Sequence, residues 1–303
     1  MMQGGAQGAQ EYGGAEAGEQ PDLQGMLTHH LLDVDYWDAV TPFGELKIYF
    51  PHFDPVQLGP LTVDLSPTKH VVFMLLAAFL CLAIFVPIGM AMRKKYQNRA
   101  PTGAANAVEA MVIYFRDEVV RRNIGHGADA YTGYILTLFF FILFMNLLGL
   151  VPFGATATGN FMVTGALALV TFVVTEISGM RALGFQGYMG TIFYAPKGLN
   201  PVGTAIMLVI LTPVEFLGKL TKPFALMIRL FANMMAGHTL VLSLLGLIFM
   251  FAGGSAIITG GVTIASLAMV SGIMLLEVFV ALLQAYIFAI LTAVFSGLIL
   301  HAH

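Results

Sequence analysis

The chain has very little charge and almost no cysteine. Of its 303 residues, 58% are hydrophobic and only 10% are charged. Soluble domains carry roughly 25% charged residues, so a large core alone does not explain the deficit. The single cysteine, Cys81, lies in an apolar run and excludes a disulfide framework. These shortages indicate a membrane protein.

Motifs of soluble catalysis are also absent. The sequence contains no Walker A loop, no Gly-x-Ser-x-Gly and no paired-cysteine metal site. The pairs His29-His30 and His301-Ala302-His303 lie near the chain ends, where isolated histidines are usually adventitious. We therefore predict no cofactor, no metal, no nucleic-acid partner and no catalysis by the chain alone.

The net charge of −3 conceals a strong asymmetry. Residues 1–68 hold ten acidic side chains against one base, Lys47, whereas Arg93-Lys94-Lys95 and Arg99 follow the first apolar run. By the positive-inside rule, the basic segment is cytoplasmic and the N-terminus faces out. Residues 1–20 lack the apolar core of a signal peptide and the arginines of a transit peptide, which favours a bacterial plasma (inner) membrane.

Composition divides the chain into three regions. Residues 1–25, rich in Gly, Ala, Gln and Glu, predict a disordered extension. Residues 26–68 contain five prolines and predict an irregular outer segment, with a short helix near 26–32 as one option. The membrane domain is expected at 69–303. Its first span, 70–92, is long enough to cross a hydrocarbon core of about 30 Å, and Pro87 is placed to kink it.

The segment 104–122 is too polar to span a membrane. It combines an apolar face at helical spacing with a charged face, so we expect a helix in the inner interface, a helix docked on a partner, or both. Two spans are predicted within 131–179, joined by a tight outer hairpin at 154–159. Arg181 then returns a base to the inner side, and a loop is expected at 184–200.

Two apolar stretches, 201–252 and 261–300, are longer than ordinary spans. A helix of about 50 residues would be about 75 Å long at 1.5 Å per residue, more than twice the core thickness. Either each stretch breaks into two spans, or each forms one steeply inclined helix. We favour an inclined helix hairpin because polar residues recur throughout both stretches, and Pro213 and Pro223 can bend the first stretch without ending it. The predicted fold is an all-α polytopic membrane protein with about five membrane helices and one interfacial helix.

Arg229 is the most informative residue because it interrupts an apolar run. A guanidinium stays charged, and holding it at bilayer depth costs at least about 2.5–3.5 kcal/mol unless an anion or water meets it. A charged substrate or an ion pathway is favoured over a structural role. On a helical wheel, Lys222 falls about 20° from Arg229, and Glu215 and Asn233 fall about 40° from it. His238 points to the opposite side, about 13 Å further along the axis.

The second long stretch carries Glu277 and Gln284, which are seven residues apart and share one helix face. We expect Gln284 to pack near Arg229 and to hydrogen-bond the guanidinium. Glu277 and His238 are expected to form a proton-exchanging pair, because carboxylate and imidazole both titrate within reach of physiological pH.

Simpler interpretations stay open for several of these side chains. Glu215 and Lys219 are placed for a surface ion pair, and Lys222 for reaching back to the interface. His238 would also serve as a structural histidine. Asn146 is better explained by an interhelical hydrogen bond than by ion ligation.

Two runs together resemble the signature of subunit a of F-type ATP synthases. They read Leu220-Thr221-Lys222-Pro223 with Arg229-Leu230-Phe231-Ala232-Asn233-Met234-Met235-Ala236-Gly237-His238, and Leu283-Gln284-Ala285-Tyr286-Ile287-Phe288. The Met145-Asn146-Leu147 span and His29-His30 are similar to further features of that family. The resemblance covers roughly residues 26–303.

The resemblance implies a proton-conducting stator subunit that couples ion flow to rotation and ATP synthesis. Two offset half-channels would meet the c-ring near Arg229, the essential arginine, with Gln284 as its neighbour. Glu215, Asn233, His238 and Glu277 would line the half-channels. The implied partners are the c-ring, the peripheral-stalk b subunits, the rest of the complex and the lipid bilayer.

One position pair departs from the usual bacterial pattern. Many bacterial relatives have Glu where this chain has His238, and His where it has Glu277, so the order of proton handling between them stays open. A competing hypothesis is a secondary transporter gripping an anionic substrate at Arg229. That class predicts internal repeats and broken helices, and neither is evident in the sequence. A structural scaffold without ion transport fits the intramembrane charges poorly.

Overall fold

The computed structural model describes residues 36–41, 44–58, 61–63, 66–95, 99–125, 127–151, 154–193 and 200–300. Five helices in these ranges are long and apolar enough to cross a membrane, which confirms the predicted all-α class. They are α2 (Lys69–Lys95), α5 (Asp129–Leu150), α6 (Phe161–Ile192), α7 (Pro201–Met250) and α8 (Ala256–Leu300). The predicted extension at 1–25, the optional helix at 26–32 and the histidines at both chain ends lie outside the described residues.

Two short antiparallel strand pairs lie in the segment expected to be irregular. Strand β1 (Tyr36–Thr41) pairs with β2 (Gly44–Tyr49), and β3 (Val56–Leu58) pairs with β4 (Leu61–Val63). The strands are rich in aromatic and β-branched residues, which favour extended backbone. The prolines limit the strand length, because Pro51 and Pro55 lie between β2 and β3 and lack the N–H that a ladder needs.

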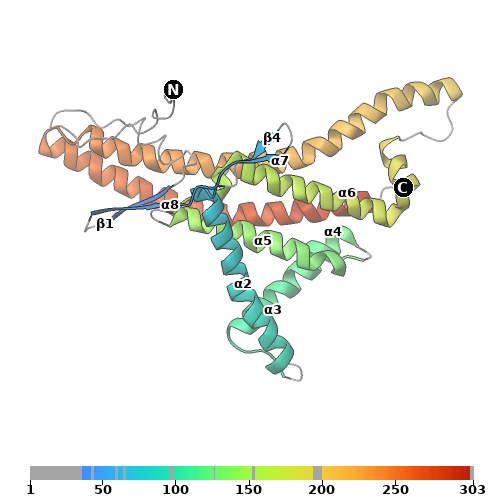
Figure 1. Ribbon diagram of the computed structural model, residues 1–303, viewed down its shortest axis with the longest axis horizontal. Coiled ribbons are helices and arrows are strands. Elements are labelled where there is room, and N and C mark those ends of the chain that lie inside the picture. The colour runs from blue at the N-terminus through green and yellow to red at the C-terminus, as the bar shows by residue number, and fades with distance from the viewer. Residues whose placement is uncertain are drawn as a thin grey trace, which may run out of the picture.

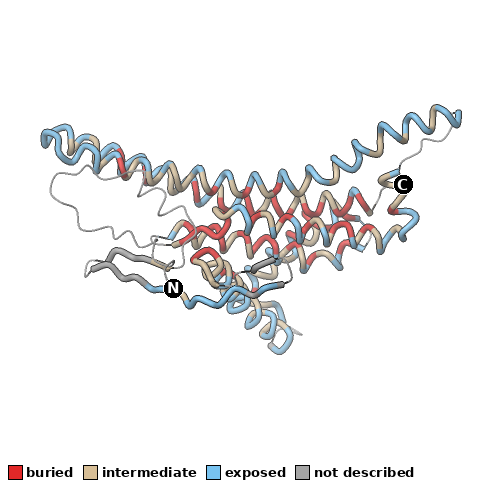
Figure 2. The backbone as a smooth tube through the Cα atoms, turned by 45° about the horizontal axis from the view of Figure 1, so that its top comes forward, coloured by how far each residue is buried: buried red, intermediate tan, exposed pale blue. Residues whose placement is uncertain are grey.

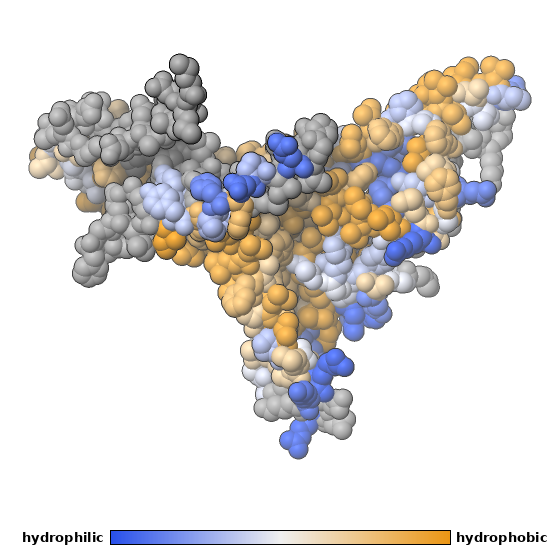
Figure 3. Space-filling view, viewed as in Figure 1, coloured by the Kyte–Doolittle hydropathy of each residue, from blue (hydrophilic) through white to orange (hydrophobic). Residues whose placement is uncertain are grey.

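Helices α2 and α3 (Ala104–Tyr114) project from the elongated body that α5 to α8 form (Figure 1). Helix α3 continues through a π-helical segment, η1 (Phe115–Arg121), into α4 (Arg122–Ile124). Its apolar face is buried, as the side chains of Phe115, Val119 and Ile124 show. Hydrophilic side chains gather at the tip where α2 ends and α3 begins (Figure 3).

The connection between α5 and α6 contains a 3-10 turn, η2 (Ala157–Gly159). Asn160 caps α6, its side chain accepting a hydrogen bond from the backbone N–H of Met162 at 2.8 Å. Helix α6 extends to Ile192, so the loop expected at 184–200 begins later than predicted. Gly184 adopts a φ of 70°, a left-handed backbone conformation that glycine adopts without steric cost. The chain resumes its helix beyond this break.

Helices α7 and α8 are single helices of 50 and 45 residues, so neither stretch divides into two spans. Pro213 and Pro223 lie inside α7 without ending it. The buried residues form a central band where α5, α6 and α8 meet the middle of α7, whereas the outer flank and both ends of α7 are exposed (Figure 2). Ile142, Met145 and Leu230 in this band are fully buried. The inclination of the pair in a bilayer stays a prediction.

Candidate functional site

Arg229 lies on the exposed flank of α7. Its neighbours Leu226 and Leu230 point inward and are 3% and 0% exposed, whereas Arg229 itself is exposed. Within the described part of the chain, Arg229 forms no hydrogen bond or ion pair. A charge held at membrane depth without an internal counterion must be met by something outside the chain.

The expected hydrogen bond between Gln284 and Arg229 is not formed. Gln284 on α8 is 2% exposed, and its Oε1 accepts a hydrogen bond from Nδ2 of Asn233 at 3.0 Å. Asn233 lies one turn beyond Arg229 on α7. The amide pair therefore ties α7 to α8 beside the arginine, and the guanidinium stays available to a partner.

Glu277 lies against the residue that precedes His238, and the proton-exchanging pair of Glu277 and His238 stays a prediction. The Glu277 carboxyl on α8 packs directly against Gly237 on α7, so that a Cβ added to Gly237 would collide with Oε1. His238, the next residue, has its Nε2 3.0 Å from Oγ1 of Thr156 in the α5–α6 connection. Helices α7 and α8 approach this closely because residue 237 has no side chain. We name Asn233, His238, Glu277 and Gln284 the outer cluster.

Asn146 makes the interhelical hydrogen bonds that the sequence predicted. Its Nδ2 donates to the carbonyl oxygen of Ala281 on α8 at 3.2 Å, and its Oδ1 accepts from Thr158 at 2.7 Å. The side chain is fully buried. Asn146 thus joins α5, η2 and α8 behind the outer cluster.

We expect Asn146→Leu to destabilise the fold by about 0.6 kcal/mol, the average for an interhelical hydrogen bond in a membrane, and by about 1.7 kcal/mol at most. The loss arises because Thr158 keeps its buried hydroxyl without an acceptor. The measurement is the midpoint of heat-induced loss of the chain from the purified complex. Thr137→Val is the control, since Thr137 is exposed and bonds only the carbonyl of Gly133 in its own helix. Equal midpoints for the two variants would contradict the role of Asn146.

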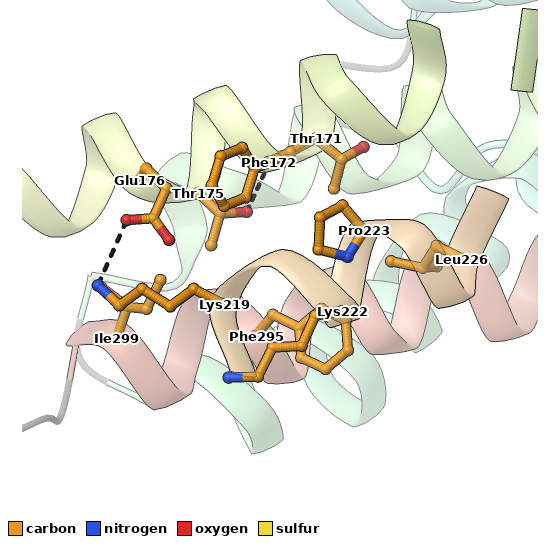
Figure 4. A pocket seen from close by; sticks show the side chains of 10 residues that line it. All are labelled: Thr171, Phe172, Thr175, Glu176, Lys219, Lys222, Pro223, Leu226, Phe295 and Ile299. Atoms are coloured by element: carbon orange, nitrogen blue, oxygen red, sulfur yellow. Dashed lines mark hydrogen bonds and ion pairs between the residues drawn. The ribbon is translucent and has the colours of Figure 1, made fainter. Parts of the chain in front are cut away.

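A second set of buried polar side chains lies nearer the start of α7, beside α6 (Figure 4). The predicted pair between Glu215 and Lys219 is wrong: Nζ of Lys219 lies 3.5 Å from Oε2 of Glu176 on α6 and 3.1 Å from Oγ1 of Thr191. The hydroxyl of Tyr188 also donates to Glu176. Glu215 is exposed and pairs with no other described residue. We name Glu176, Tyr188, Thr191 and Lys219 the inner cluster.

Our reading of the sequence missed Glu176. It is an acid within an apolar span, which is the same signal that singled out Arg229. Its partner Lys219 lies 43 residues away, and Tyr188 and Thr191 lie beyond the break at Gly184, in the segment predicted as a loop. Their positions along the chain therefore do not indicate that these residues group together.

The inner cluster borders a small pocket between α6, α7 and α8. It is lined by Thr171, Phe172, Thr175, Glu176, Lys219, Lys222, Pro223, Leu226, Phe295 and Ile299. Lys222 places its Nζ 5.4 Å from the ring centroid of Phe295. The cavity volume is about 20 Å³, enough for about one water molecule.

Ion pairs join the interfacial segment to α5. Arg121 reaches Asp117 with its Nη1 at 2.9 Å and Asp129 with its Nε at 2.8 Å. The hydrogen bond from Arg116, with the charges of Arg116 and Arg121, lowers the pKa of Asp117 below its ordinary value. Asp117 therefore stays ionised at neutral pH, and this exposed network is a surface feature distinct from the two buried clusters.

Comparison with known proteins adds independent information. Residues 71–297 match the family model described as "ATP synthase A chain". ATP synthase subunit a of Chloroherpeton thalassium is 44% identical, over 89% of this chain and 75% of that protein. ATP synthase subunit a 2 of Chlorobaculum tepidum is 44% identical, over 94% and 74%. ATP synthase subunit a of Anaeromyxobacter dehalogenans is 42% identical, over 95% and 73%.

Proposed function

Because the chain belongs to the ATP synthase subunit a family, we propose that it conducts protons past Arg229 to the carboxylates of a rotating c-ring. The chain is a multi-pass integral membrane protein and a subunit of the Fo sector, and it acts as the stator. Catalysis of ATP synthesis belongs to other subunits of the complex. The peripheral-stalk b subunits would hold this chain still while the ring turns.

The observation that carries this proposal is the position of Arg229, which pairs with no other described residue, between the two polar clusters. His238 of the outer cluster lies nine residues from Arg229, and Lys219 of the inner cluster lies ten residues away in the other direction. At 1.5 Å per residue these separations are about 13 and 15 Å along α7. Arg229 therefore lies about midway along α7 between residues of the two clusters, as a residue that separates two half-channels would.

The mechanism follows from the cost of charge in lipid. A ring carboxylate must be protonated to face the bilayer, because a bare anion there is too costly. The outer cluster would line the half-channel that supplies protons, and Arg229 would favour the ionised carboxylate as it passes. The fixed positive charge also repels a free proton, which prevents a short circuit. Each charge moved across 100 mV yields about 2.3 kcal/mol for rotation.

The proposed function also implies an orientation of the chain in the membrane. The basic residues Arg93-Lys94-Lys95 end α2, so this end would face the bacterial cytoplasm. The acidic residues before α2 would then lie on the outer side of the inner membrane. The outer cluster would open to that side, and the inner cluster to the cytoplasm.

Passive proton conduction tests the proposal. We expect Glu277→Gln to slow conduction at least about tenfold in vesicles stripped of the catalytic sector, because an amide cannot relay a proton. Glu118→Gln is the control, since Glu118 lies exposed on η1, where it pairs with Arg122 at 3.2 Å. Unchanged conduction in Glu277→Gln would remove this residue from the path.

A further inference from the structure

The inner cluster holds a charge pair that stability alone does not require. The side chains of Glu176 and Lys219 are only 10% and 12% exposed. Removing two charges from water often costs as much as their attraction returns, and a well-packed apolar pair is frequently as stable. The carboxylate is therefore retained at a cost that a purely structural contact does not explain.

Two side chains of the cluster contact the Glu176 carboxyl group directly. Tyr188 donates its hydroxyl to Oε2, and Nζ of Lys219 approaches the same oxygen. Lys219 is itself held by Thr191 and lies 4.2 Å from the ring centroid of Tyr188. All these contacts use Oε2, so the other carboxylate oxygen is left for a proton or for water.

The neighbouring cavity extends from this carboxylate along the inward face of α7, in the direction of the turn that carries Arg229. Its wall includes the side chains of Glu176 and Lys219 at one end and Pro223 and Leu226 at the other, and Leu226 lies within one turn of Arg229 on α7. Hydroxyl groups of Thr171 and Thr175 add polar lining. A cavity of this volume has room for about one water molecule beside the Glu176 carboxyl group.

Packing at the far end of α8 places the cavity on the inner side. Phe295 and Ile299 line it, and Gly297 between them lies so close to Asn123 that an added Cβ would collide with the Asn123 carbonyl. Asn123 belongs to α4, the end of the interfacial segment. The cavity therefore lies at the end of α8 that packs against α4.

We propose that Glu176 is the proton acceptor of the inner half-channel, a role that rests on the function proposed above. A proton leaves the ring carboxylic acid near Arg229, crosses the cavity through water and neutralises the Glu176 carboxylate. Glu176 then releases it to the cytoplasmic side and becomes an anion again. Lys219 and Tyr188 are positioning residues: they hold the ionised form ready for the next proton.

The charged and titratable groups around Glu176 come from three helices. Helix α7 contributes Lys219 and Lys222, and α6 contributes Tyr188. Helix α5 contributes Tyr134, whose hydroxyl donates to Thr171 at 3.3 Å. The residues that α8 adds to the cavity wall, Phe295 and Ile299, do not titrate. Among the described residues of this cavity, Glu176 is the acid.

The test is proton conduction with the assembled complex in inverted vesicles, before and after removal of the catalytic sector. Glu176→Gln is expected to slow passive conduction by roughly tenfold. This loss is smaller than that expected for an obligatory proton-transfer group, because water provides a second route for the proton. Glu176→Asp should restore part of the rate and shift its dependence on cytoplasmic pH. Tyr188→Phe should shift the same pH profile while leaving the carboxylate in place.

A double variant separates proton transfer from a structural ion pair. Glu176→Gln with Lys219→Gln leaves neither charge buried alone, so it also decides the matter if the single variant fails to assemble. Conduction that stays slow in the double variant supports the role of Glu176, and recovery to the wild-type rate overturns it. Wild-type rates in Glu176→Gln alone also overturn it. If Glu277→Gln remains slow in the same assay, the proposed function stands and only this inference fails.

Discussion

Arg229→Ala is expected to reduce ATP-driven proton pumping in membrane vesicles to background while the complex still assembles. Assembly should survive because Arg229 lies on the exposed flank of α7 and pairs with no other described residue, whereas Leu226 and Leu230 provide the inward packing. Pumping should be lost because no other group on this face between Lys222 and Asn233 carries a fixed charge to confront the ring carboxylate. The measurement is acidification of the vesicle lumen on adding ATP.

Arg229→Lys provides the matched control for charge. Lysine restores a cation, but it can lose its proton when desolvated and lacks the planar fork of a guanidinium. We expect weak pumping that remains far below the wild-type rate. Wild-type pumping in Arg229→Ala, with normal amounts of the chain in the complex, would contradict the proposed role.

Gly237→Ala is expected to lower passive proton conduction at least about tenfold, as large an effect as loss of the Glu277 carboxylate. The added methyl group would collide with Oε1 of Glu277, so either the carboxyl leaves its site or α7 and α8 separate. Both outcomes disturb the outer cluster. Conduction is measured in vesicles stripped of the catalytic sector, with a potassium diffusion potential as the driving force.

Gly133→Ala is the matched control for this substitution. Gly133 lies on the exposed side of α5, where an added Cβ meets no atom within 4 Å. Its conduction should equal that of the wild type. If Gly237→Ala conducts equally well, the close packing of Glu277 on α7 has no part in proton passage.

The sequence predicted the features that depend on the cost of polarity in lipid. Arg229, Glu277 and Gln284 stand out because each interrupts an apolar run, and Asn146 was expected to bond across helices for the same reason. The unbroken helices α7 and α8 also follow, since proline need not end a membrane helix when neighbours satisfy its freed carbonyl.

Pairings between helices could not be predicted in the same way. The contact of Lys219 with Glu176 depends on how α6 packs against α7, and i,i+4 spacing favoured the wrong acid, Glu215. Likewise, Gln284 bonds Asn233, and Arg229 pairs with no other described residue. A loop is predicted from Gly184 onward because glycine often ends a helix. In the structure the chain turns at this glycine and then resumes the helix.

Cysteine cross-linking tests the central claim that the Arg229 flank faces a rotating carboxylate. Cys81 is the chain's one cysteine, so Cys81→Ser gives a clean background. Ala232→Cys lies on the exposed flank within one turn of Arg229, and Leu230→Cys replaces a fully buried neighbour. Each is combined with a cysteine beside the ring carboxylate. Rapid disulfide formation from position 232 and none from position 230 is the predicted result, and absence of any link from position 232 would contradict the account.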